Sequence, residues 1–162
     1  MPRSRSRLAN DAWESLLTAH AALMKRFAAE PIWDELSMRE YDVLYTLAKH
    51  GEPMRLYELG RGVLLSQPAL SRLVDRLAER GLVERAPDPA DGRGLRLALT
   101  ETGREQQRRV GGRHAVDVAR AVNAALTDEE MRQLEAIGRK LAACDPAPPP
   151  QTRRPNRQEA PR

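Results

Sequence analysis

The chain is predicted to be mainly α-helical with one small β-hairpin, an α+β fold, because two patterns recur along its 162 residues. Apolar residues return at spacings of three and four in six separate segments, which is typical of amphipathic helices. Two short runs, 82–85 and 95–100, instead place apolar side chains at period two, and turn-forming residues separate them. We therefore expect helices arranged around a single hairpin.

Composition excludes several classes of protein. No run approaches the ~18 consecutive apolar residues of a membrane-spanning helix, so no span is expected. The basic start of the chain is followed by no apolar stretch, so we expect no secretory signal. One cysteine, Cys144, excludes an internal disulfide and a cysteine-based zinc site. A cytoplasmic protein without a cofactor is therefore predicted.

The net charge of +4 is concentrated at the ends of the chain. Residues 1–7 hold three arginines, and residues 145–162 hold four arginines against two acidic residues, so the part between them is slightly acidic. Both ends, 1–7 and 144–162, are predicted to be disordered basic tails. Binding of nucleic acid by the folded part would therefore depend on particular arginines and not on bulk charge.

Three helices are predicted in the first half of the chain. Residues 8–29 are amphipathic, and Pro31 interrupts them. The sequence SMRE (37–40) has the form of a capping box, and it opens a helix that ends near Gly51. A short third helix follows at 56–63.

A fourth helix is predicted to begin after Ser66 and to stop at Gly81. At about 100° per residue, one side of it is apolar and carries Leu70, Leu73, Val74 and Leu77. The other side carries Pro68, Ser71, Arg72, Asp75 and Arg76, with Gln67 at the exposed N-terminus. A short polar face with two arginines suits the major groove of DNA. An ordinary solvated helix face is the alternative.

The sequence DPADGRG (88–94) joins the two strands of the predicted hairpin and places Arg93 between two glycines. An arginine at such a tip can enter a narrow minor groove, and Asp91 can orient it through a charge-assisted hydrogen bond. A solubilising arginine in a turn is the alternative. Helices, a turn and this hairpin together predict a winged helix-turn-helix domain over 37–100.

Two further helices are predicted at the C-terminal end. The fifth begins at Thr100, and Gly111 and Gly112 suggest a kink or weak point within it. The sixth follows the capping box TDEE (127–130). The apolar stripes of the first and last helices find no partner in so small a winged domain. We therefore expect 8–36 and 101–143 to form a helical dimerisation region.

The stretch SQPALSRLVDRLAERGLVERAPDPADGRGLRLALTETG (66–103) resembles the MarR family of bacterial winged-helix transcription factors. Asp91 and Arg93 fit the D-x-R motif of its wing, and Leu97, Leu99, Thr100 and Gly103 fit the motif that follows. YDVLYTLAKHG (41–51) and AWESLLTAHAALMKRF (12–27) resemble the second and first helices of the family. The resemblance spans about 8–143 and departs at Gly62 and at Gly111–Gly112. It implies a homodimer built by the first, fifth and sixth helices.

The resemblance also implies a ligand site between the dimerisation region and the winged domain. His20 lies on the apolar side of the first helix, with Trp13, Met24 and Tyr45 as candidate neighbours. These residues are read either as an aromatic effector pocket or as packing within a dimer. Cys144 is read either as a redox switch or as a thiol without a role. His20, His50 and His114 show no ligand spacing, so no metal site is predicted.

The predicted function is sequence-specific binding of double-stranded DNA at a pseudo-palindromic operator, as a repressor that a small, aromatic ligand releases. An architectural DNA-binding protein without an effector is the alternative. The chain holds no phosphate-binding glycine loop and no supported Ser/His/Asp grouping, so an enzyme is not predicted. The predicted DNA-contacting residues are Ser66, Gln67, Pro68, Ser71, Arg72, Arg76, Asp91 and Arg93.

Overall fold

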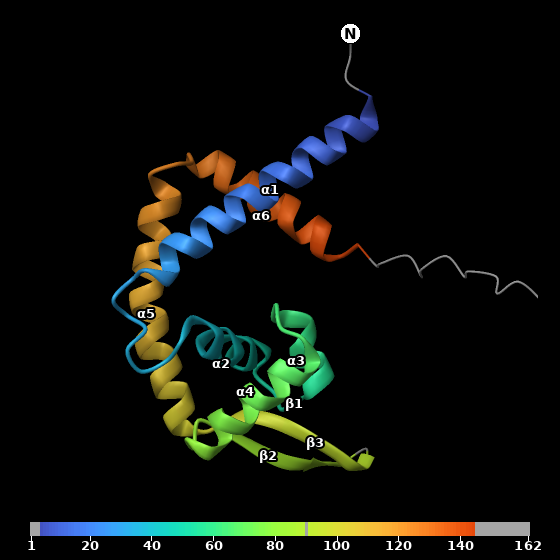
Figure 1. Cartoon of the computed structure of the whole chain (residues 1–162), viewed down its shortest axis with the longest axis vertical. Helices are drawn as coiled ribbons and strands as arrows, with labels where there is room; N and C mark the ends of the chain where they lie inside the picture. The colour runs from blue at the N-terminus through green and yellow to red at the C-terminus, as the bar shows by residue number, and fades with distance from the viewer. Residues whose placement is uncertain (1–3, 90, 145–162) are drawn as a thin grey trace, which may run out of the picture. The chain divides into compact units, whose positions relative to one another are not determined.

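The protein is mostly helical with one small antiparallel sheet (Figure 1). A computed structural model describes residues 4–89 and 91–144, with the side chains of Asp91, Gly92 and Arg93 left out. The elements are α1 (Arg5–Ala28), α2 (Met38–His50), β1 (Met54–Arg55), α3 (Leu56–Gly62), α4 (Gln67–Glu79), β2 (Val83–Asp88), β3 (Asp91–Leu99), α5 (Glu101–Asn123) and α6 (Asp128–Ala142). The mainly α fold with a wing-like hairpin is confirmed.

The chain divides into two compact units, Met1–Ala121 and Val122–Arg162. The first contains α1 to α4, the sheet and nearly all of α5, and the second contains α6. Residues 145–162 of the predicted tail 144–162 lie outside the described residues, as do residues 1–3 of the N-terminal tail. The remainder of that tail is not a separate segment, because α1 begins at Arg5 and Ser4 caps it.

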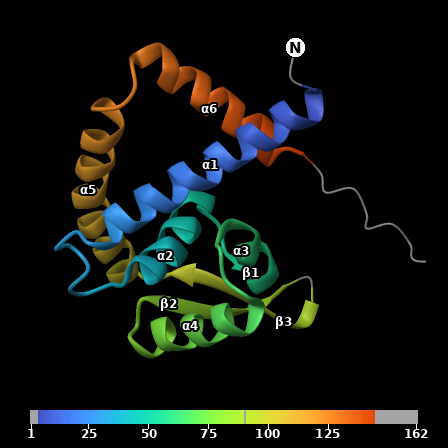
Figure 2. The ribbon, with the colours of Figure 1, turned by 45° about the horizontal axis from the view of Figure 1, so that its top comes forward.

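The sheet has the strand order β1-β3-β2, so β3 is its central strand. β2 and β3 pair from Val83↔Leu99 to Pro87↔Leu95, and the register then shifts to Asp88↔Asp91. The hairpin is therefore longer than predicted, and its connection is shorter than DPADGRG. Figure 2 shows the two strands side by side, extending away from the first turn of α5. β1 was not predicted, because a strand of two residues has no period to detect.

Helix ends follow the predicted capping residues closely. Ser37 and Glu40 form a complete capping box at α2, and Gly51 ends that helix with a φ of 81°. Thr127 and Glu130 form the same arrangement at α6. Ser66 occupies the N-cap position of α4, but its side chain makes no capping hydrogen bond. The two capping boxes and Gly51 confirm that short-range sequence signals set these helix boundaries.

Gly62 and Gly111, where the chain departs from the family pattern, occupy positions with little room for a side chain. α5 is a single helix across Gly111 and Gly112, and a Cβ at Gly111 would lie 3.0 Å from the Tyr41 hydroxyl. At the end of α3, a Cβ at Gly62 would lie 2.7 Å from Cγ2 of Thr46. Both glycines therefore allow α2 to pack closely against a neighbouring helix.

The core lies within the winged helix-turn-helix region, where α2, α3 and α4 contact one another and the sheet. The largest fully buried side chains among the described residues are Leu36, Leu44, Leu59, Leu70, Leu77, Val43 and Val74. The predicted apolar side of α4 is buried as a whole, since Leu70, Leu73, Val74 and Leu77 are each at most 4 % exposed. This burial turns the polar side of α4 outward.

The connection between α1 and α2 is held against α5. Trp33 Nε1 donates a hydrogen bond of 2.7 Å to the carbonyl oxygen of Phe27. The His114 ring on α5 lies 5.1 Å from the Phe27 ring, 5.3 Å from the Trp33 ring and 5.6 Å from the Tyr41 ring. This aromatic cluster joins the C-terminal end of α1, the connection and α2 to the middle of α5 within the first unit.

Candidate nucleic-acid interface

The outward face of α4 carries the polar residues that the sequence assigned to it. Ser66, Gln67 and Pro68 are exposed at the N-terminal end of the helix, and Arg72 and Arg76 are exposed further along it. Ser71 and Asp75 are partly buried. The structure therefore brings all the predicted α4 residues to one helix, with a buried apolar side that fixes which way they face.

The two arginines of α4 differ from Asp75 in their contacts. Asp75 forms an ion pair with Arg85 of β2, which ties the helix to the hairpin. Among the described side chains, neither Arg72 nor Arg76 forms an ion pair, and Arg76 only donates a long hydrogen bond of 3.4 Å to the Arg72 carbonyl oxygen. The guanidinium groups of Arg72 and Arg76 are thus available to a ligand.

Asp91 and Arg93 belong to β3 by their backbone, and their side chains lie outside the described residues. The prediction placed Arg93 in a loop between two strands, and this is corrected, because β3 already begins at Asp91. Residues 92–94 fall between the pairs Pro87↔Leu95 and Asp88↔Asp91, where the ladder is irregular. The register of the two strands therefore shifts at this end of the hairpin.

Asp88, at the end of β2, forms a charged cluster that the sequence did not reveal. Its side chain is fully buried, and its Oδ2 accepts a hydrogen bond of 2.5 Å from Arg55 Nε. The Nε of Arg96 lies 3.1 Å from Oδ1, as an ion pair without hydrogen-bond geometry. We call Arg55, Asp88 and Arg96 the Asp88 cluster; it links all three strands.

The surroundings of the Asp88 cluster hold its arginines in fixed positions. Arg55 and Arg96 are direct cross-strand partners of β1 and β3, and Arg96 Nη1 also donates to the Pro53 carbonyl oxygen at 3.1 Å. The hydrogen bond that Arg55 donates to Asp88, and then the charge of that carboxylate, raise the pKa of Arg55. Glu58 accepts the backbone N–H of Arg55 at 2.7 Å, and this hydrogen bond lowers the pKa of its carboxyl group.

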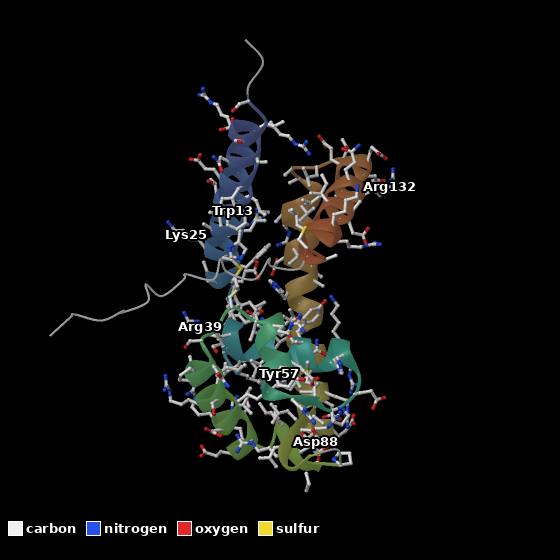
Figure 3. The ribbon with its side chains drawn as sticks, turned by 90° about the vertical axis from the view of Figure 1, so that its right-hand side faces the viewer. Trp13, Lys25, Arg39, Tyr57, Asp88 and Arg132 are labelled. Carbon is white, nitrogen blue, oxygen red and sulfur yellow. The ribbon has the colours of Figure 1, made fainter. Side chains whose placement is uncertain are left out.

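A hollow of about 580 Å³ lies between α1 and α2, with the α3–α4 turn and His114 of α5 completing its wall. We call it the α1–α2 hollow. His20, Met24 and Tyr45, three of the four predicted effector residues, line it. Trp13 does not, because it lies about two turns before His20 along α1. Figure 3 shows Trp13 well apart from Arg39, which lines the hollow.

Basic groups outnumber acidic ones around the α1–α2 hollow. Arg39 and Lys49 line it together with His20 and His114, whereas Asp42 is the one carboxylate among its described lining residues. Burial raises the pKa of Asp42, and the charge of His114 acts in the opposite direction. An anion with an apolar body fits such a wall better than a cation does.

Membrane-spanning helices and metal-binding clusters are both absent from the described residues. No helix in this part of the chain is long and apolar enough to cross a membrane. No three His, Cys, Asp or Glu side chains of the described ranges gather as metal ligands would. Cys144, the single cysteine, is exposed.

Comparison with known proteins points to one family. Residues 35–94 match a family model described as the MarR family. The HTH-type transcriptional regulator Mb0904 of Mycobacterium bovis is 31% identical over 102 residues, which are 63% of this chain and 68% of the relative. The matched region spans about half to two thirds of the length of the curated relatives.

Solved structures extend the likeness to most of the chain. The MarR family regulator Sco3205 of Streptomyces coelicolor, solved in complex with DNA, is 29% identical with a TM-score of 0.69; the match covers 88% of this chain and 90% of that chain. NadR, solved in complex with 4-hydroxyphenylacetate, is 26% identical with a TM-score of 0.69 and coverages of 81% and 92%. The proteins with which the chain shares its sequence pattern and fold are transcriptional regulators, not enzymes.

Proposed function

Because this chain belongs to the MarR family, we propose that it is a transcriptional regulator that binds double-stranded DNA as a homodimer. The observation that carries the proposal is the division of α4 into a fully buried apolar side and an exposed side with two free arginines. A helix of this kind, next to a hairpin, is the right size for the major groove.

The proposed contacts divide between two grooves. Arg72 or Arg76 reads a base edge in the major groove, where guanine O6 and N7 accept a bidentate guanidinium. Ser66, Gln67, Pro68 and Ser71 lie at the N-terminal part of α4, which approaches the bases first. Arg93, oriented by Asp91, enters the adjacent minor groove from the hairpin.

Alanine variants of Arg72, Arg76 and Arg93 test this division. A duplex selected from a random pool by the unaltered protein serves as the operator, at one fixed salt concentration. Loss of a base-reading arginine on α4 should cost about 1–3 kcal/mol and relax preference at particular base pairs. Arg93→Ala should weaken binding most where the flanks are rich in A·T. Equal binding by all three variants would contradict the proposal.

The homodimer rests on apolar surface that the single chain leaves open. α6 contains no buried residue, and Leu134, Ile137 and Leu141 are each more than half exposed. A two-fold dimer is the commonest way to cover such a stripe. It would place two α4 helices on a pseudo-palindrome with half-sites about 10–10.5 bp apart, measured centre to centre. Light scattering should give about twice the chain mass of 18.2 kDa.

We assign the α1–α2 hollow to a small aromatic acid that releases the protein from DNA, and hence a repressor role. Its basic rim and its aromatic and methionine side chains support an anion with an apolar ring. The test is operator binding with increasing 4-hydroxyphenylacetate, against its neutral ethyl ester as control. Arg39→Gln should reduce the response to the acid, whereas Arg108→Gln, outside the hollow, should not. No response to any aromatic acid would favour the effector-independent alternative.

A further inference from the structure

The Asp88 cluster places two arginines beside one buried carboxylate. Arg55 and Arg96 are direct cross-strand partners, and like charges in such positions repel each other. One arginine would be enough to pair with the buried carboxylate of Asp88. The second guanidinium adds repulsion, which an anion from outside would relieve. The two guanidinium groups therefore carry more N–H donors than one carboxylate can accept.

Both arginines keep N–H donors that Asp88 and the Pro53 carbonyl oxygen do not use. Arg55 uses Nε for Asp88, and Arg96 uses Nε and one Nη atom for Asp88 and Pro53. A guanidinium has five N–H donors, so the remaining Nη groups can still donate. The two side chains are 32% and 35% exposed, although Asp88 between them is fully buried. Two guanidinium groups that a buried carboxylate holds in place, and that are themselves partly exposed, suit the binding of an oxyanion.

The position of the cluster indicates which oxyanion it meets. Arg55 directly precedes α3, which packs against α4, and Arg96 lies on β3, which begins in the wing at Asp91. Figure 3 shows Asp88 and Tyr57 of α3 in the same part of the winged domain. A protein with one helix in the major groove and a hairpin in the adjacent minor groove must cross the sugar-phosphate strand between them. The pair Arg55↔Arg96 joins the strand that precedes α3 to the strand that leads into the wing, so a phosphate of that crossing strand is the oxyanion we expect there.

We propose that Arg55 and Arg96, where β1 pairs with β3 beside the wing, form a phosphodiester-binding pair that Asp88 orients. This inference rests on the proposed DNA binding. Because Glu58 and Asp88 balance the two arginines in charge, the site works through fixed N–H donors and not through local net charge. Asp88 is a positioning residue that does not touch the DNA.

Neutral variants of the arginines test the phosphate contact. Arg55→Gln and Arg96→Gln should each weaken binding about three- to tenfold, equally for a selected operator and for a mixed-sequence duplex of the same length. Each should also lower the slope of log K against log salt by about one, because one fewer phosphate is neutralised. Ethylation of single phosphates should reveal one whose modification interferes with unaltered protein but not with Arg55→Gln.

A charge-matched control is present on α5. Glu101 accepts from Arg104 and Arg108 at 3.1 Å and 3.4 Å, so it is also one carboxylate between two arginines, but it is exposed and lies beyond the other end of β3. Arg104→Gln should leave affinity and salt slope unchanged. Asp88→Asn and Glu101→Gln each remove one negative charge and so raise the net charge by one. If Asp88 orients the pair, Asp88→Asn should nevertheless bind more weakly, whereas Glu101→Gln should not.

The outcomes separate this inference from the proposed function. If the unaltered protein binds neither duplex, both fail. If it binds its operator while the two Arg→Gln variants keep its affinity and salt slope, only the phosphate pair is overturned. Weaker binding of the operator alone, with an unchanged slope, also overturns the phosphate pair.

The orienting role of Asp88 has its own outcomes. Tighter binding by Asp88→Asn overturns that role. Where Asp88→Asn fails to fold by circular dichroism, Arg55→Lys decides that role: weaker binding at retained charge supports it, and unchanged binding overturns it.

Discussion

Apolar side chains are buried in the winged helix-turn-helix region but exposed on the last helix. Leu44, Leu59 and Leu77 are completely buried within the winged region. On α6, Leu134 and Ile137 are about half exposed although they form an equally regular stripe. The same periodic signal thus leads to an internal core in one region and to an open surface in the other. The first forms its own core, whereas the apolar stripe of the second is the surface that we propose a second chain covers.

The largest effect is expected for a cavity in the winged core. Leu77→Ala should lower the free energy of unfolding by about 2–5 kcal/mol, because a fully buried leucine loses its packing contacts. Leu64→Ala is the control, since Leu64 is 88% exposed and its loss should change stability by about 0.5 kcal/mol or less. Urea unfolding measures both. Equal losses would remove the contrast between buried and open apolar residues.

A charge on the α6 stripe should act on association. Ile137→Asp should convert the dimer to monomers at micromolar concentration, because a carboxylate would be buried at the proposed interface. Ala136→Asp introduces the same group on the opposite side of the helix and should leave the dimer intact. Light scattering over a dilution series distinguishes the two variants. A dimeric Ile137→Asp protein would show that another surface associates.

A smaller effect is expected from the half-buried carboxylate in the α1–α2 hollow. Burial raises the folded-state pKa of Asp42 above its ordinary value of 3.8. Its contribution to stability is therefore present below that value and is lost as pH rises through the folded pKa. Asp42→Asn should consequently be more stable than the unaltered protein at pH 7, with little difference at pH 3. Asp34→Asn, which removes the same charge from an exposed position, serves as control in thermal melts.

The smallest effect concerns the capping box of α6. The backbone N–H of Thr127, and then its hydroxyl, lower the folded-state pKa of Glu130 below 4.5. This carboxylate therefore stabilises the protein above the ordinary pKa, and the contribution is lost as pH falls through the folded pKa. Glu130→Gln should lower Tm slightly at pH 7 and not at pH 3. A difference that grows on acidification would contradict the assigned role.

Local signals predicted local structure well. Ser37 with Glu40, and Thr127 with Glu130, lie three residues apart, so the sequence alone identifies the start of α2 and of α6. The buried side of α4 was also predictable, because periodicity within one helix needs no knowledge of its neighbours. The glycine- and proline-rich segment 88–94 was predicted as a loop. The structure instead extends β2 to Asp88 and begins β3 at Asp91.

Contacts between distant residues could not be predicted. Arg55 and Asp88 are 33 residues apart, and only the strand order β1-β3-β2 brings them together. Asp88 was predicted as a turn residue, because no pattern in the sequence indicates that its side chain is buried. Trp13 was predicted as a neighbour of His20, but it does not line the hollow. The hollow instead meets only the C-terminal half of that helix.

The joint between the hairpin and α5 makes the wing a lever. Thr100 Oγ1 donates to the Gly81 carbonyl oxygen at 2.6 Å and accepts from the Gly103 N–H at 3.0 Å. A Cβ at Gly103 would overlap the Leu82 carbonyl oxygen, so no side chain separates the helix from the strand base. β3 is nine residues long, or about 30 Å at ~3.3 Å per residue. If the joint stays rigid, a tilt of about 5° in the first turn of α5 displaces the wing end by roughly 2–3 Å over that length. That distance is a large fraction of a minor groove ~6 Å wide.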